Sequence, residues 1–310
     1  SHIQAVLTGG DLPMALMTAA ALLGIAFFSV QHIRLLAINQ WAYLKFRKTI
    51  GYEALKASNN EINLMAIPLT YGMLMNVLLI LGALFVPGLW NVVEFLFPFV
   101  LVAYGLIGAY ALRLFSIYFS RLLLDGDFDF IRNNSLSQLL SSFAFMMIAV
   151  GFAAAGAMSR VELVSVTGIL AAVFFATISL LLLGIKMVLG FKSMFRQGIS
   201  KESVPSLWII IPIMTLLGIT LVRIGSGIYH NILHGELPPV VTFALMSILV
   251  SIQGISGLIG FLVLKKSNYF SEYLNGDRKS AGSYSLVCPG VGAAVLGMFF
   301  IHWGFVKTGL

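Results

Sequence analysis

Long stretches without charged residues dominate the chain. Residues 133–159, 237–264 and 280–306 carry no formal charge. A helix that crosses a bilayer needs about 20 predominantly apolar residues. A surface helix of a soluble protein instead keeps one polar face. The pattern therefore predicts an all-α, polytopic membrane helix bundle.

Eight segments of this kind follow one another and leave no room for a soluble domain. We therefore expect a single transmembrane domain over residues 1–310. The hydrophobic fraction of 59% and the charged fraction of 10% agree with a membrane protein. The expected spans are residues 13–37, 62–87, 93–120, 134–158, 162–190, 204–228, 239–265 and 280–308.

Prolines and small polar residues favour the even-numbered spans. Pro68, Pro212 and Pro289 fall in the second, sixth and eighth spans, and Ser141 and Ser142 fall in the fourth. A proline within a membrane helix frees a backbone carbonyl, which protein or cavity water must satisfy. We therefore expect the even spans to line an interior and the odd spans to face lipid. The alternative is that the small residues only permit close helix packing.

Basic residues set the expected orientation. Lysines and arginines crowd the first, third, fifth and seventh connections, whereas residues 87–91 have none and the fourth connection has only Arg160. Cytoplasmic loops carry the excess of these residues. The odd connections are therefore predicted to be cytoplasmic, with both ends of this chain on the outer side. The same scatter shows no basic stripe, so we expect no nucleic-acid partner.

The polar residues of the even spans suit an anion. An anion accepts hydrogen bonds, so its path needs hydroxyl and amide donors and no carboxylate nearby. The even spans, as bounded above, contain no Asp or Glu. The alternative for any one of these residues is hydrogen bonding between helices. The candidate donors are Thr70, Asn76, Ser141, Ser142, Ser283 and Ser285.

Arg223 lies near the outer end of the sixth span. An arginine within a membrane segment is by default a functional candidate that faces a cavity or a partner. We expect it to attract anions at the outer mouth. The alternative is that its side chain extends to the lipid headgroups.

The histidines offer a less favoured reading. His230 and His234 are four residues apart and would share a helix face, and His302 is also expected on the outer side. Together they are the candidates for a metal or haem site. The alternative is that they are simply histidines at the membrane interface. The single cysteine, Cys288, excludes an internal disulfide and a cysteine metal cage. We therefore expect no cofactor, and no group of residues suggests an enzyme.

Several stretches resemble the tellurite-resistance/dicarboxylate transporter family, whose fold is shared by the plant guard-cell slow anion channel. They are Asn63-Leu-Met-Ala-Ile-Pro68-Leu-Thr-Tyr-Gly, residues 104–113, Ser206-Leu-Trp-Ile-Ile-Ile-Pro212 and Ser283-Tyr284-Ser285-Leu-Val-Cys-Pro289. Hydropathy and loop lengths are similar over essentially the whole chain.

The resemblance implies a fold of five helical hairpins whose odd helices line a pore. Eight spans would remain if the first and last helices of that fold were absent. It also implies a homotrimer in a bacterial plasma (inner) membrane, with one pore in each protomer. The function implied is an anion channel or exporter for chloride or nitrate, sulfite or thiosulfate, or a dicarboxylate. Tyr284 falls at the gate position, with Pro68, Pro212 and Pro289 in pore helices.

Two other functions stay open from the sequence. One is a haem- or metal-binding membrane subunit for electron transfer that uses the histidines. The other is a non-transporting membrane anchor of a larger complex.

Overall fold

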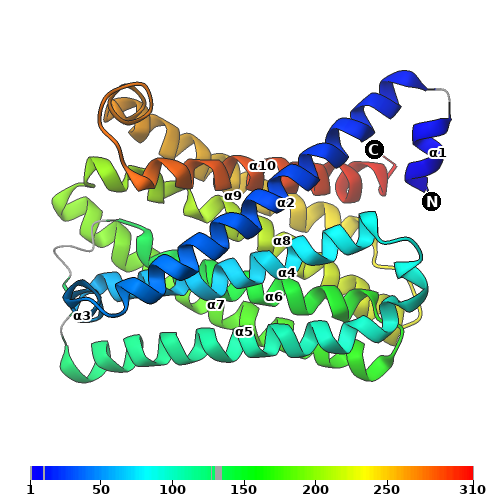
Figure 1. The fold of residues 1–310 in the computed structure, drawn as a ribbon, viewed down its shortest axis with the longest axis horizontal. Helices are drawn as coiled ribbons and strands as arrows, with labels where there is room; N and C mark the ends of the chain where they lie inside the picture. Colours follow the sequence, from blue (N-terminus) through cyan, green and yellow to red (C-terminus); the bar gives the residue numbers. More distant parts are fainter. Residues whose placement is uncertain (1, 10, 127, 130–134, 310) are drawn as a thin grey trace. The chain divides into compact units, whose positions relative to one another are not determined.

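A computed structural model describes residues 2–9, 11–126, 128–129 and 135–309, and every regular element in these ranges is helical (Figure 1). Eight helical segments of this described part are long and apolar enough to cross a membrane, which confirms the predicted all-α bundle. The start of the fourth predicted span, residue 134, lies outside the described residues. The elements are α1 (His2–Thr8), α2 (Leu12–Phe46), α3 (Ile50–Lys56), η1 (Asn59–Met65), α4 (Ala66–Phe85), α5 (Leu89–Asp125), η2 (Ser137–Leu139), α6 (Leu140–Met158), α7 (Glu162–Gln197), η3 (Lys201–Ile209), α8 (Ile210–Gly227), η4 (Ile228–Ile232), α9 (Pro239–Lys266), η5 (Phe270–Leu274), η6 (Ala281–Leu286), α10 (Val287–Phe299) and η7 (Phe300–Val306).

The chain forms two compact units, one of Ser1–Ala54 with Met73–Val93 and one of Leu55–Gly72 with Glu94–Leu310. A single transmembrane domain stays a prediction. In the first unit, the Asp11 carboxylate caps α2 by accepting from the Met14 N–H at 3.2 Å. The helix then continues to Phe46, beyond the predicted end, and the Phe46 ring packs on Tyr52 of α3 at 5.9 Å between centroids.

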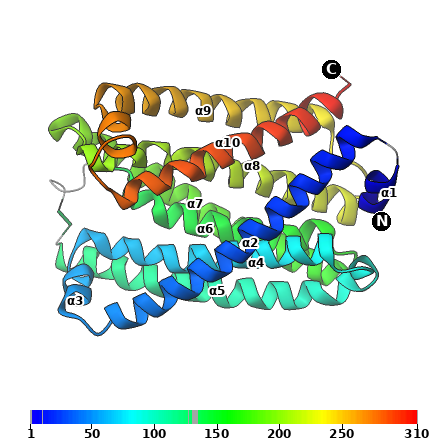
Figure 2. The same ribbon diagram turned by 45° about the horizontal axis from the view of Figure 1, so that its top comes forward.

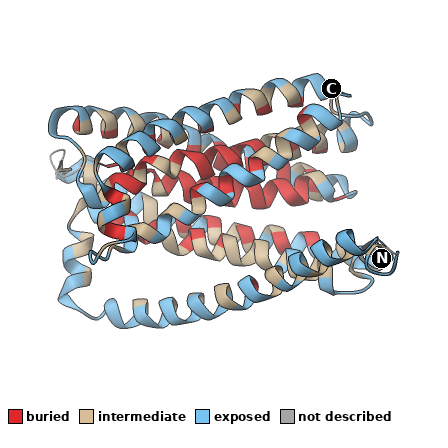
Figure 3. Ribbon diagram, turned by 90° about the horizontal axis from the view of Figure 1, so that it is seen from above, coloured by how far each residue is buried: buried red, intermediate tan, exposed pale blue. Residues whose placement is uncertain are grey.

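The second unit is built around α6. Every residue from Ser141 to Gly156 is buried, and the most buried helices occupy the middle of the bundle (Figure 3). A helix that is apolar all round belongs in such a position. Within the described residues, 94% of the most apolar 18-residue stretch of the fourth span is buried. The corresponding share is 61% for the sixth span and 17% for the eighth.

The predicted inner ring is therefore correct for α6 and α8 and wrong for α10. It is also wrong for the second span, which is 28% buried against 39% for the odd fifth span. The cause for α10 is that this helix contacts α8 and α9 along one face only. Its buried residues are Pro289, Gly292 and Leu296, three and four residues apart, and the other positions are largely exposed. A stripe of this width is typical of a helix at the edge of a bundle.

Each even span begins with a short 3₁₀ helix. The elements η1, η2, η3 and η6 come directly before α4, α6, α8 and α10. Pro68, Pro212 and Pro289 each occupy the third residue of the α-helix that follows. A proline is tolerated in the first turn of an α-helix because an N–H at that position would have no carbonyl partner within the helix. The prolines thus mark the change from 3₁₀ to α-helix instead of breaking the middle of a span.

All four of these starts lie at one end of the second unit. The connections 198–200 and 267–280 lie at that end, and the connections 159–161 and 233–238 lie at the opposite end (Figures 1 and 2). We call these the odd-connection end and the even-connection end. The positive-inside pattern predicts that the odd-connection end is cytoplasmic.

Candidate functional site

A cavity of about 520 Å³ opens where the four short helices meet at the odd-connection end. We call it the serine cavity, because five of its lining residues are serines. Its deeper wall is apolar and includes Leu140, Phe143, Ile209 and Pro212. The polar lining residues are Asn63, Ser135, Ser137, Glu202, Ser203, Ser206 and Ser285.

Hydrogen bonds within the chain hold several of these serines in place. The Ser206 hydroxyl accepts from the Leu136 N–H at 3.0 Å, and the hydroxyls of Ser135 and Ser137 are 2.9 Å apart. The Ser285 hydroxyl donates to the Gly282 carbonyl at 2.6 Å. A hydroxyl that uses one donor or acceptor still has a free lone pair or a rotatable proton. The cavity therefore presents several adjustable polar groups above an apolar floor.

Glu202 corrects one expectation from the sequence. We expected no carboxylate in the even spans, but the sixth span begins with η3 at Lys201, before the predicted start at 204. The exposed Glu202 side chain consequently lies among the residues that line the serine cavity. The buried Glu61 in η1 is a second exception, and it is paired with Arg121 at 3.1 Å.

A second cavity of about 230 Å³ lies at the even-connection end. We call it the histidine cavity, and its lining includes Ser226, His230, Glu236, Trp303 and Lys307. His230 and Trp303 both come from π-helical turns, η4 and η7. Such turns often occur at functional sites.

The histidines do not assemble into a metal site in the described part of the chain. No group of three or more His, Cys, Asp or Glu residues there is suited to hold a metal ion. The His230 Nδ1 atom pairs with Asn231 Oδ1 at 2.9 Å. His234 and His302 are both exposed, and the His302 ring contacts Trp303 edge-on.

Arg223 lies along α8 between the two cavities. Its Nη1 atom donates to the Val150 carbonyl of α6 at 2.9 Å, and Val150 is near the middle of that helix. Among the described residues, no carboxylate forms an ion pair with Arg223. The guanidinium thus lies near the middle of the bundle with one identified acceptor.

The direction of the Arg223 side chain rules out the headgroup reading. α6 and α8 run the same way, since Leu136 bonds Ser206 at one end and Asn231 bonds the Gly156 carbonyl at the other. Side chains on a helix tilt toward its N-terminus. Arg223 therefore points toward the middle of the bundle, away from the even-connection surface.

One face of α8 runs from the serine cavity to the histidine cavity. Residues on this face are spaced three or four apart, so they form a single stripe. The stripe comprises Ile209, Pro212, Leu216, Ile219, Arg223, Ser226 and His230. A matching stripe on α10 and η7 comprises Ser285, Pro289, Gly292, Leu296, Trp303 and Lys307.

The predicted gate residue lies at an exposed position outside the serine cavity. The Tyr284 side chain is 82% exposed and is not among the residues that line the serine cavity. It lies in η6, where the chain has not yet entered α10. Its neighbour Ser283 bonds the Tyr269 hydroxyl at 2.9 Å, whereas Ser285 lines the cavity as expected of a path residue.

The remaining candidate donors have partners within the protein. The Ser142 hydroxyl bonds both the carbonyl and the hydroxyl of Ser179, each at 2.9 Å. The hydroxyl of Ser141 donates to the Gln138 carbonyl at 3.1 Å, and that of Thr70 to the Ile67 carbonyl at 2.9 Å. The Ser142 contacts join α6 to α7, as in the alternative stated above, whereas the bonds of Ser141 and Thr70 are local to their own spans. Pro68 is buried and Asn76 half-buried, both on α4.

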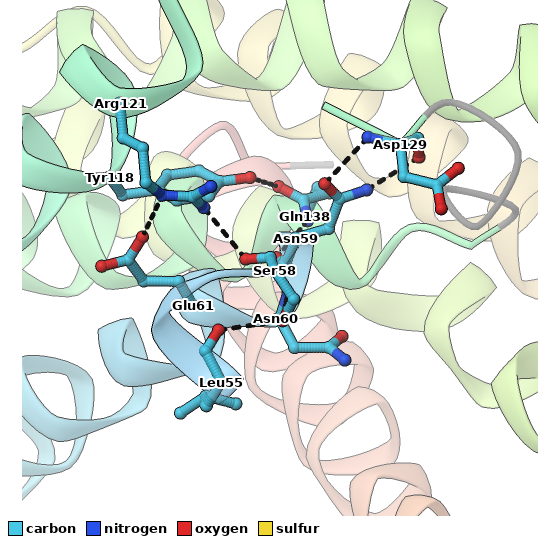
Figure 4. Close-up of polar contacts among 9 residues, drawn as sticks. All are labelled: Leu55, Ser58, Asn59, Asn60, Glu61, Tyr118, Arg121, Asp129 and Gln138. Atoms are coloured by element: carbon cyan, nitrogen blue, oxygen red, sulfur yellow. Dashed lines mark hydrogen bonds and ion pairs between the residues drawn. The ribbon is translucent and has the colours of Figure 1, made fainter. Parts of the chain in front are cut away.

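A polar cluster lies beside the serine cavity and joins η1, α5 and η2 (Figure 4). Arg121 bonds both the Glu61 carboxylate and the Ser58 carbonyl, each at 3.1 Å. The Tyr118 hydroxyl donates to the Gln138 side chain at 2.8 Å, and that side chain donates to the Asn59 carbonyl at 2.9 Å. This cluster fixes the odd-connection end of the second unit.

The sequence reasoning missed most serines of the cavity. Ser135, Ser137 and Ser206 lie inside the predicted spans, just before their α-helices, but were not among the candidate donors, and Ser203 lies in a predicted connection. The available signal was the recurrence of serine a few residues before Pro212 and Pro289.

Comparison with known proteins finds no matching family model, no matching curated protein and no matching solved structure.

Proposed function

We propose that this chain is a membrane transport protein, a channel or exporter for small anions whose path lies within each protomer. Its resemblance to the tellurite-resistance/dicarboxylate family supports a homotrimer in a bacterial inner membrane. The same resemblance suggests chloride or nitrate, sulfite or thiosulfate, or a dicarboxylate as the anion.

Arg223 is the observation that carries the proposal. A guanidinium deep in a membrane bundle is costly unless it meets an opposite charge or a wet cavity. Arg223 has neither a carboxylate within ion-pair distance among the described residues nor a direction toward the headgroups. A permeating anion would supply the missing charge, and it would meet this cation between the two cavities.

The proposed path follows the facing stripes of α8 and α10. An anion would enter the serine cavity, where hydroxyls replace part of its hydration shell. It would then pass the apolar level of Leu216 and Ile219, reach Arg223, and leave through the histidine cavity. An apolar constriction of this kind gates by excluding water. In this proposal the gate would lie on α8 and not at Tyr284.

Anion flux and ion selectivity in proteoliposomes test the proposal. We expect Arg223→Gln to lower anion flux at least 10-fold and to lower the anion-to-cation permeability ratio. Arg223→Lys should retain the selectivity with reduced flux, since lysine keeps the charge but not the planar fork. Because the guanidinium is buried, we expect similar losses at low and high salt.

Arg113→Gln is the matched control, because Arg113 is an exposed arginine on α5. It should leave flux and selectivity unchanged. Normal flux and normal selectivity in a folded Arg223→Gln protein would refute the proposal.

A further inference from the structure

Lys186 on α7 is a cation without an acid partner. Its Nζ atom donates to the Gln138 Oε1 atom at 3.3 Å, and it lies 5.4 Å and 5.6 Å from the ring centroids of Tyr118 and Phe115. Among the described residues no carboxylate forms an ion pair with it. Amide and aromatic contacts stabilise an ammonium, but they do not neutralise its charge.

The polar cluster beside Lys186 keeps its own carboxylate paired. Glu61 bonds the Arg121 side chain at 3.1 Å (Figure 4). The Gln138 Oε1 atom that accepts from Lys186 also accepts from Tyr118. The local network therefore positions the ammonium and leaves its charge for a ligand from outside the chain.

Lys186 also borders an apolar groove of about 150 Å³ between α5 and α7. The groove is lined by Phe119 and Leu122 on one helix and by Leu182, Ile185 and Leu189 on the other. Gln138, at the start of the fourth span, lines its polar end. The groove lies toward the odd-connection end, where the positive-inside pattern predicts the cytoplasmic leaflet.

We propose that this groove, the lysine groove, binds an anionic phospholipid of that leaflet. The phosphate would accept from the Lys186 ammonium, and part of one acyl chain would lie between α5 and α7. Basic pockets between membrane helices on the cytoplasmic side suit such headgroups. The site is separate from the serine cavity, so this proposal stands or falls independently of anion transport.

Thermal unfolding of the detergent-solubilised protein tests the site. A ligand that binds only the folded state raises the melting temperature as its concentration exceeds its dissociation constant. We expect short-chain phosphatidylglycerol to raise Tm by several degrees and phosphatidylcholine of the same chain length to raise it far less. Lys186→Met should weaken phosphatidylglycerol binding at least 10-fold, and Lys186→Arg should retain most of it.

Lys192→Met is the matched control, because Lys192 lies on the same helix and does not line the groove. It should keep the full shift. Leu189→Trp fills the groove while keeping the lysine, and it should also abolish the rise in Tm with phosphatidylglycerol. This variant replaces Lys186→Met in the test if Lys186→Met does not fold.

Two results would overturn the proposal. The first is a phosphatidylglycerol shift that survives in both Lys186→Met and Leu189→Trp. The second is an equal shift with inorganic phosphate, which would assign the cation to a free anion instead of a lipid.

Discussion

At the residue scale, the sequence predicts the chemical character of a side chain more readily than its position in the fold. The sequence marks Arg223 as a functional candidate because an arginine in an apolar run is costly wherever it points. Its contact with Val150 depends on how α6 and α8 pack, and no pattern within the sixth span contains that information. Lys186 is one of the basic residues that set the expected orientation, and the sequence alone does not show which side chains face it.

The gate offers a residue-level prediction with opposite outcomes at two positions. We expect Leu216→Ser to raise anion flux, because a hydroxyl lets water into an apolar constriction. Tyr284→Ala should leave flux and Tm nearly unchanged, because a side chain that is 82% exposed contributes little to packing. Flux measurements on the two variants in parallel decide the matter. A rise in flux for Tyr284→Ala alone would restore the tyrosine as the gate.

At the element scale, close backbone approach joins α6, α7 and α8 near the even-connection end. A Cβ atom at Gly168 of α7 would lie 2.7 Å from the Gly156 nitrogen, and one at Gly227 of α8 would lie 2.6 Å from the Gly156 oxygen. Small residues permit such contacts in membrane bundles. The sequence showed these glycines, but it could not show which helices they bring together.

Gly168→Ala should therefore destabilise the protein, by about 1–3 kcal/mol on the scale of overpacked sites. The neighbouring atoms belong to the backbone and cannot rotate away. Gly184→Ala is the control on the same helix, because a Cβ there meets nothing within 4 Å. That change should be neutral or stabilising, since alanine favours helix by up to about 1 kcal/mol. Equal Tm values for the two variants would show that the glycine contact does not matter.

The connection between α9 and α10 carries an ion-pair cluster with a defined pH response. Glu272 accepts from Lys201 Nζ at 2.6 Å and from Arg278 Nη1 at 2.9 Å. The hydrogen bond from Lys201, aided by both positive charges and opposed by partial burial, lowers the pKa of Glu272. A lowered pKa means stability that is present above the unfolded value of about 4.3 and lost as pH falls through the folded value.

Glu272→Gln should therefore lower Tm at pH 7 and reduce the further loss of Tm between about pH 5 and pH 3. Asp277→Asn in the same connection removes a negative charge for which no ion pair is found in the described structure, and it should retain the wild-type pH profile. A profile for Glu272→Gln that parallels the wild type would show that the cluster does not stabilise the fold.

At the scale of the whole molecule, the sequence predicted the number of spans and their apolar character, because the bilayer sets both. It did not predict that α6 lies at the centre while α10 lies at the edge. Every even span carries small or polar residues, and only packing separates Ser142, bonded to α7, from Ser285, which lines a cavity. The alternation rule is therefore correct for the fourth and sixth spans only, because the odd fifth span is more buried than the even second and eighth spans.

The single cysteine tests the orientation of the whole molecule. Cys288 is half-buried and lines the serine cavity, so a thiol reagent that cannot cross membranes should reach it from one side only. The excess of lysine and arginine in the odd connections predicts that this side is cytoplasmic. Inside-out vesicles should therefore be labelled and right-side-out vesicles should not, with Cys288→Ala as the background. Because the chain has one cysteine, every label reports this cavity.

Labelling from the outer side would invert the orientation and make the serine cavity the outer mouth. Labelling in detergent but from neither side of a vesicle would instead show that the serine cavity is closed to water. That result would contradict an open cavity at the protein surface.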